Sequence, residues 1–337
     1  MIPAMPRFHA RWPWIGADLQ TLRNFLIRPD FSAAGARSER LEIALADGSG
    51  DSLLGLVDRP ADRATRSLVV LVHGLTGCSE SSYMRATAAS LLGAGHCVLR
   101  LNLRGAGGGR NLARGHYHAG CSQDLAAVLG ALPASLTAHG VTAVGFSLGG
   151  NVLLKHLGEA GHATRLQAAA SVSAPIDLAA CSARLRAPRN TIYQRYLLAR
   201  MKRDAAGIAA SLTPAQRRAV DEVRDVYGYD DRVVAPSHGF SGAPDYYARC
   251  SAASFLTRIR IPTLLIHALD DPWIPGDLYR RVDWPHLPQL QPLLPVGGGH
   301  LGFHAAGSRV AWHDQAIARF LAQPLNRHQA RAVGEER

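Results

Sequence analysis

Short, continuous apolar runs rich in Val, Leu and Ile recur along the chain and predict buried strands. Hydrophobicity that does not alternate is typical of strands covered on both faces, as in a parallel sheet. The runs lie at 67–72, 97–101, 141–145, 168–172 and 263–267, and helix-like stretches at 82–93, 121–132 and 148–157 separate the first four. This alternation of strands and helices predicts an α/β fold with a mostly parallel, doubly wound sheet.

Different patterns mark the two ends of this sheet. Residues 40–46 and 52–57 alternate in part between polar and apolar positions, and the turn signal Asp-Gly-Ser-Gly at 47–50 separates them. We therefore expect an antiparallel hairpin before the parallel strands. The last run, 290–296, contains two prolines. Because proline cannot donate a hydrogen bond to a neighbouring strand, this run is expected to be an edge strand or irregular.

The length and the order of these elements predict one α/β domain over residues 1–337. Residues 1–38 are expected to form a packed N-terminal arm or short helix. From about 175 to 261 there is no clear strand, but there are helical segments around 191–205 and 214–226. This stretch is interpreted as a cap-like insertion above the sheet. The polar tail at 324–337 is expected to fray.

Composition supports a folded protein and argues against a membrane-spanning one. Apolar residues make up 47% of the chain and charged residues 19%, so a sizeable core is expected. No apolar run reaches the roughly 18 residues of a spanning helix, and the start lacks the pattern of a signal peptide. These observations favour a cytoplasmic protein. They do not exclude peripheral contact with a membrane surface.

The charge and the cysteines exclude two further classes. The net charge of +11 comes almost wholly from arginines that are spread along the chain, since Lys155 and Lys202 are the only lysines. Without a basic block or a binding motif, nucleic acid is not an expected partner. The cysteines number five and form no CxxC pair, so free thiols are expected rather than disulfides or a zinc site. We expect no cofactor and no metal.

The strongest chemical signal is Gly145-Phe146-Ser147-Leu148-Gly149, which lies between a predicted strand and a predicted helix. This is the setting of a nucleophile elbow, in which a strained turn makes the serine hydroxyl project. Glycines two positions to either side let the backbones pass closely. Ser147 is therefore the candidate nucleophile.

A serine nucleophile needs a base and an acid that orients the base, and after an elbow the acid precedes the histidine. Asp271 follows the run 263–267 in the pattern Asp-Pro-x-Ile-Pro and is the preferred acid. Asp270 is the neighbouring alternative and Asp177 a weaker third. His300 follows the last strand within a glycine-rich loop and is the candidate base. His304 lies nearby but lacks the glycine approach.

Two backbone N–H groups are candidates for an oxyanion hole. The N–H of Leu148 starts the helix after the elbow. The loop His73-Gly74-Leu75 ends the run 67–72, and Leu75 is expected to supply the second donor, with His73 bracing the loop. His116 and His118 suggest no metal site, since no third ligand is evident. The glycine-rich segment 104–110 lacks the ending of a phosphate-binding loop.

With these residues in view, the chain resembles the YheT-like hydrolases, the AB hydrolase 4 family of the α/β-hydrolase superfamily. The motifs that carry the resemblance occur in the same order over most of the chain: Asp18-Leu19-Gln20-Thr21-Leu22, His73-Gly74, Leu103-Arg104-Gly105, Tyr117-His118-Ala119-Gly120, the Ser147 elbow, Ser173-Ala174-Pro175, Tyr193-Gln194-Arg195-Tyr196-Leu197, Asp245-Tyr246-Tyr247, Asp270-Asp271-Pro272 and Gly299-His300-Leu301-Gly302-Phe303.

The resemblance implies an α/β-hydrolase fold with an eight-stranded, mostly parallel sheet, and a catalytic triad on Ser147, Asp271 and His300. It also implies hydrolysis of carboxylic esters, with lipid or short- to medium-chain acyl esters as substrates. An acyltransferase that passes the acyl group to an alcohol would use the same triad and is the alternative. A non-catalytic binding module is the third hypothesis, against which an intact triad argues.

Overall fold

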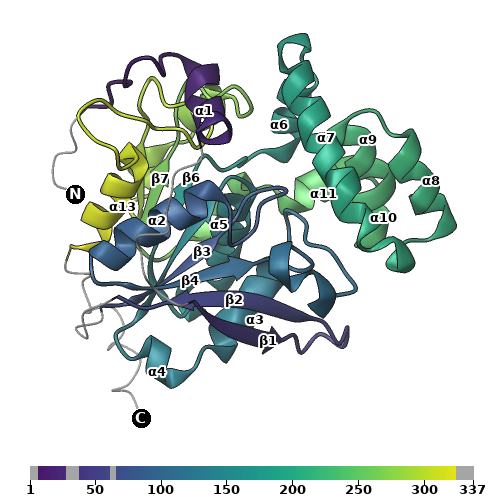
Figure 1. Ribbon diagram of the computed structural model, residues 1–337, viewed down its shortest axis with the longest axis horizontal. Helices are drawn as coiled ribbons and strands as arrows, with labels where there is room; N and C mark the ends of the chain where they lie inside the picture. Colours follow the sequence, from purple (N-terminus) through teal and green to yellow (C-terminus); the bar gives the residue numbers. More distant parts are fainter. Residues whose placement is uncertain (1–6, 28–37, 61–65, 324–337) are drawn as a thin grey trace.

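An eight-stranded sheet forms the centre of the molecule, with the strand order β1-β2-β4-β3-β5-β6-β7-β8. The computed structural model describes residues 7–27, 38–60 and 66–323, and Figure 1 shows their arrangement. The strands are β1 Glu39–Ala44, β2 Ser52–Asp58, β3 Leu68–Val72, β4 Cys97–Asn102, β5 Val141–Phe146, β6 Leu166–Val172, β7 Thr263–Ile266 and β8 Leu290–Leu293. From β4 to β8 all neighbouring strands run parallel, as the continuous apolar runs predict.

Both ends of the sheet agree with the patterns in the sequence. Strands β1 and β2 form the antiparallel hairpin, and β2 joins the rest of the sheet by pairing antiparallel with β4. Strand β8 is the opposite edge strand and has a single neighbour, β7, so its Pro292 costs little in hydrogen bonding. It ends at Leu293, before the second proline of the predicted run.

Helices cover both faces of the sheet. On one face, α2 (Ser82–Gly93) and α13 (Trp312–Leu321) contribute to an apolar cluster with the strands. On the other face, α3 (Ser122–Ala131) and α5 (Leu148–Ala160) contribute to a larger cluster. The short helices α4 (Ala134–Thr137) and α12 (Gly276–Arg280) lie in connections between strands. Two apolar layers on one sheet account for the fully buried central strands.

The chain between β6 and β7 is helical, as expected from the lack of strand patterns there. Its helices are α6 Leu178–Leu185, α7 Thr191–Ala206, α8 Pro214–Glu222, α9 Val226–Tyr229, α10 Ala235–Ser237 and α11 Ala243–Cys250. Figure 1 shows most of this segment standing out to one side of the sheet. The helix expected around 214–226 is in fact two. It ends at Glu222 because Val223 is extended, and the side chain of Asp225 caps the next helix by accepting from Gly228 N–H.

The N-terminal arm contains a helix, α1, which spans Ala17–Leu26. It packs on the loop between β8 and α13, because the Gln20 amide donates to the carbonyl of His304 and accepts from its N–H. The rest of the predicted arm is described only in part, and the tail at 324–337 lies outside the described residues.

Candidate active site

Ser147 occupies the turn between β5 and α5 in a left-handed backbone conformation, with φ 50° and ψ −123°. A residue other than glycine adopts such a conformation only where its surroundings enforce it. The turn is tight enough that a Cβ on Gly149 would lie 2.4 Å from the carbonyl oxygen of His73. The sharp strand-to-helix turn expected from the glycine spacing is therefore present, and it presents the Ser147 hydroxyl at the carboxyl edge of the sheet.

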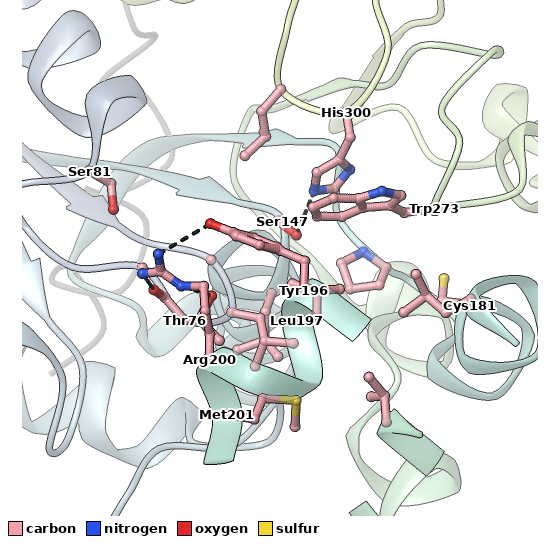
Figure 2. A pocket seen from close by; sticks show the side chains of 18 of the residues that line it. Thr76, Ser81, Ser147, Cys181, Tyr196, Leu197, Arg200, Met201, Trp273 and His300 are labelled. Atoms are coloured by element: carbon pink, nitrogen blue, oxygen red, sulfur yellow. Dashed lines mark hydrogen bonds between the residues drawn. The ribbon is translucent and has the colours of Figure 1, made fainter. Parts of the chain in front are cut away.

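Three side chains from separate loops form one hydrogen-bonded line. The hydroxyl of Ser147 lies 3.0 Å from Nε2 of His300, and Nδ1 of that imidazole lies 2.8 Å from Oδ2 of Asp271. With the Nδ1 proton donated to the carboxylate, Nε2 is left to accept from the serine. Figure 2 shows the imidazole of His300 directed at the hydroxyl of Ser147. The structure thus brings together all three residues that the sequence singles out.

The carboxylate of Asp271 is buried, and both of its oxygens accept hydrogen bonds. Its Oδ1 accepts from the N–H groups of Trp273 and Ile274, while Oδ2 faces His300. Burial alone would raise the pKa of this carboxyl, but the charge and hydrogen bond of His300 and the backbone donors outweigh it and hold the pKa below its usual value. The group is therefore ionised at neutral pH, as a partner of an imidazolium must be.

The two alternative acids have other partners. Oδ1 of Asp270 accepts from the N–H of Gly299 and so braces the loop that carries His300. Burial and the neighbouring Asp271 raise the pKa of Asp270, against the effect of that hydrogen bond. Asp177 is the N-cap of α6, where its side chain accepts from Ala180 N–H. Neither carboxylate has a recorded hydrogen bond to His300 among the described residues.

The position of His300 depends on two residues to which the sequence assigned no chemical role. Thr21 of α1 accepts the backbone N–H of His300 on its hydroxyl at 2.8 Å. The ring of Trp273 stacks on the imidazole, with centroids 4.2 Å apart and planes inclined by 28°. His304 does not compete for the role of base, since burial lowers the pKa of its side chain to about 3. Its backbone N–H donates to the side chain of Gln20.

The loop after β3 is fixed on both sides of Leu75. The hydroxyl of Tyr83 accepts the N–H of Gly74 at 2.9 Å, and that of Tyr117 accepts the N–H of Thr76 at 2.6 Å. No backbone partner of the Leu75 N–H is recorded in the described part of the chain. Leu148 is the first residue of α5, where N–H groups have no partner within the helix. Both are thus backbone donors close to the elbow with their hydrogen-bonding capacity unused.

His73 braces this loop, as expected. Its Nδ1 contacts the carbonyl of Gly74 at 2.8 Å, and its Nε2 accepts the N–H of Leu103 at 3.1 Å. Burial lowers the pKa of His73 to about 4, so the ring is neutral at physiological pH. This histidine therefore links the ends of β3 and β4 and has no free nitrogen for catalysis.

Comparison with known proteins identifies the family. Residues 67–306 match the family described as the α/β-hydrolase fold. The protein YheT of Escherichia coli (strain K12), whose name calls it a candidate esterase, is 34% identical over 269 residues, which is 79% of this chain and 78% of that protein. The chain is a YheT-like α/β-hydrolase. Phospholipase ABHD3 of Homo sapiens is a more distant relative, 27% identical over 299 residues, with 87% of this chain and 72% of that protein covered.

Solved structures show the same fold. The esterase Pf2001 of Pyrococcus furiosus superposes with a TM-score of 0.58 over 94% of this chain and 96% of its own, at 15% sequence identity. Together with the esterase and lipase relatives, the fold makes this YheT-like protein a carboxylic ester hydrolase. Within the described residues, no helix has the length and apolar character needed to span a membrane.

A cavity of about 620 Å³ opens beside Ser147, and the helical segment between β6 and β7 forms part of its wall. Leu185, Leu197 and Met201 line it from α6 and α7, and Trp273 and His300 line it from the sheet side. Figure 2 shows Leu197 and Met201 on α7 below the serine. A cavity of this size with an apolar wall on α6 and α7 is suited to an acyl chain or another apolar group of a small molecule.

The glycine-rich segment, the candidate metal ligands and the cysteines lie outside the triad. Arg104, which opens the glycine-rich segment, makes ion pairs with Asp47, Asp51 and Asp124 and so ties the hairpin to the parallel sheet. No group of three or more metal-binding side chains occurs within the described ranges. All five cysteines are free.

Proposed function

We propose that this hydrolase cleaves carboxylic esters of short- or medium-chain acyl groups, or of lipids, through an acyl-enzyme on Ser147. The line from Ser147 through His300 to Asp271, at 3.0 and 2.8 Å, is the observation that carries the proposal. A serine hydroxyl is a weak nucleophile at neutral pH unless a base lies within hydrogen-bond reach. Here the base is in reach, and a buried carboxylate orients it.

The reaction would run in two halves. Nε2 of His300 takes the hydroxyl proton while Oγ of Ser147 attacks the ester carbonyl carbon, and the carbonyl oxygen becomes an oxyanion. The N–H groups of Leu75 and Leu148 would donate to that oxygen, which fits their unused donor capacity. When the tetrahedral species collapses, the bond to the alcohol oxygen breaks and His300 returns the proton to it. A water molecule, deprotonated by His300, then attacks the carbonyl carbon of the acyl-enzyme. The carboxylic acid is released, and His300 returns the proton to Oγ of Ser147.

The apolar wall of the cavity supports an acyl substrate, and the helices that form this wall support a cap. We propose that residues 1–337 form one hydrolase domain in which about 175–261 is the cap over the acyl site. Side chains of α6 and α7 form part of the cavity wall, so the cap would select among acyl groups. The phospholipase and lipase names of relatives are in line with a lipid ester as substrate.

A fluorophosphonate probe tests the proposed nucleophile directly. We expect the wild-type protein to be labelled, with the adduct located on Ser147 by mass spectrometry of the digest. p-Nitrophenyl esters of increasing acyl length then report the acyl preference, which should decline once the chain exceeds the cavity. If ethanol added to the assay gives ethyl esters in preference to free acid, the acyltransferase alternative is correct. A protein that takes no label would point to the binding module.

Arg200 of α7 is proposed to hold the oxyanion loop in place. Its Nη2 donates to the carbonyl of Thr76 at 2.7 Å and its Nε to the hydroxyl of Thr76 at 3.1 Å. Figure 2 shows the side chain of Arg200 beside Thr76. Thr76 follows Leu75 and has a φ of 56°, a strained conformation for a residue other than glycine. The contact therefore links the proposed cap to the proposed oxyanion donor.

Replacing Arg200 with alanine should lower kcat for a small p-nitrophenyl ester about ten- to a hundredfold, with little change in KM, because the loop would relax and misplace one donor. Arg203→Ala is the matched control, since Arg203 lies on the same helix and is exposed. Arg200→Lys should recover only part of the activity, because lysine cannot reproduce the two-point contact. An equal loss in both alanine variants, or a rise in KM alone, would contradict this role.

A further inference from the structure

Exposed large apolar side chains are confined to one end of the molecule. Among the described residues they are Trp12, Ile15, Leu19, Phe25, Leu26, Ile27, Ile192, Tyr196, Val296 and Val310. Six belong to the segment 12–27 that contains α1, two to the start of α7, and two to the loop between β8 and α13. None lies on a connection at the opposite edge of the sheet, where the parallel strands begin. We call these ten residues the apolar rim.

The three parts of the apolar rim are joined around the cavity that contains Ser147. Helix α1 is bound to the β8–α13 loop through the hydrogen bond of Thr21 to His300. It is bound to the helical segment through Asp18, which pairs with Arg189 and accepts from the hydroxyl of Tyr193 at 2.8 Å. Phe25 and Tyr196 lie edge to face with centroids 5.5 Å apart, and both line the cavity. The apolar rim therefore meets the cavity at Phe25 and Tyr196.

The charged side chains beside the apolar rim favour an anionic surface. The exposed charged positions of α7 are Arg195 and Arg203, both basic, and Arg189 just before this helix is exposed as well. Arg189 is paired with the acidic Asp18, so these two residues together add no net charge, and the excess positive charge comes from Arg195 and Arg203. The chain as a whole has a net charge of +11. Apolar side chains flanked by arginines are typical of surfaces that insert into the headgroup region of anionic lipid layers.

We propose that the apolar rim docks this hydrolase on the surface of an anionic lipid bilayer, with the mouth of the cavity facing the lipid. A second copy of the chain is a poor occupant, because it would bring together the arginines that lie beside the apolar rim of each copy. A protein partner seated on the rim would close the cavity to substrate, whereas a lipid layer offers esters through the contact itself. This last argument rests on the proposed ester hydrolysis.

Sedimentation with vesicles tests the docking without relying on activity. The full-length Ser147→Ala variant should bind vesicles of phosphatidylglycerol and phosphatidylcholine, bind those of phosphatidylcholine alone more weakly, and release from the former as salt is raised. Adding Leu26→Ser and Ile192→Ser should weaken binding at least about tenfold, since both side chains are exposed and would lose their burial in lipid. Neither residue lines the cavity, so the same pair of substitutions in the active protein should leave hydrolysis of a water-soluble ester unchanged.

A charge-matched pair of variants separates docking from simple adsorption. Arg195→Glu on α7 should weaken vesicle binding, while Arg260→Glu, an exposed residue just before β7 at the opposite edge, should not. Equal loss in both would reduce the effect to net charge and overturn the proposal, as would a wild-type chain that does not bind the anionic vesicles. A dimer that the Leu26→Ser and Ile192→Ser pair dissociates would assign the rim to a second copy. The Ser147→Ala variant should lose ester hydrolysis but still bind vesicles. The docking test can therefore fail or succeed independently of the test of ester hydrolysis.

Discussion

Replacing Ser147 with alanine is expected to lower kcat for p-nitrophenyl esters by up to about a millionfold, because without the hydroxyl there is no acyl-enzyme and the rest of the triad has nothing to activate. The residual rate would come from the two backbone donors and from substrate binding. Alanine has the same Cβ as serine, so the backbone at φ 50° has no reason to change and the elbow should be retained. Steady-state kinetics with a correction for trace wild-type enzyme measure the effect.

Ser81→Ala is the control for this substitution. Ser81 lines the same cavity, but its hydroxyl accepts the N–H of Cys78, is hydrogen-bonded to the Tyr83 side chain, and has no recorded contact with His300. Its loss should change kcat by less than about tenfold, as expected for the loss of loop hydrogen bonds that leave the triad in place. A fluorophosphonate label that persists in Ser147→Ala, together with wild-type turnover, would assign the nucleophile to another residue.

Local patterns in the sequence are sufficient to predict the sheet and the order of the three candidate catalytic residues. Continuous apolar runs predicted the parallel strands because burial on both faces leaves no room for alternation. The glycines around Ser147 predicted its turn because side chains there would collide with the backbone of the neighbouring loop. Proline in the last run predicted the edge position of β8. In each case the residue type itself carries the information, whether through its apolar character, its missing Cβ or its missing N–H donor.

The supporting contacts could not be predicted in this way, because they join residues far apart in the chain. Thr21 meets His300 across 279 positions, and Arg200 meets Thr76 across 124. Both stood in or near recognisable sequence motifs, but a motif does not say what its side chains contact. For a related reason, the sequence did not determine whether Asp270 or Asp271 is the acid that faces His300. Adjacent residues in a loop point in different directions, and only the fold determines which one faces the histidine.

In the structure Asp271, and not Asp270, faces His300, and a substitution with a large expected effect can test this assignment. Asp271→Asn should lower kcat about ten-thousandfold at neutral pH, by analogy with the same change in other triads. The amide cannot stabilise an imidazolium, and its NH₂ group would favour the tautomer of His300 whose Nε2 carries the proton and cannot accept from Ser147. Rate measurements over a range of pH, together with a thermal melt, would show the loss and whether the fold survives.

Asp270→Asn is the matched control, because it removes the same charge one residue away. Its oxygen could still accept from Gly299 N–H, so the loop that carries His300 should hold and kcat should fall by no more than about tenfold. The contrast between the two variants, rather than either value alone, distinguishes an acid that orients the base from one that braces a loop. If Asp270→Asn were the more damaging substitution, the hydrogen bond between His300 and Asp271 would not be the one that operates during turnover.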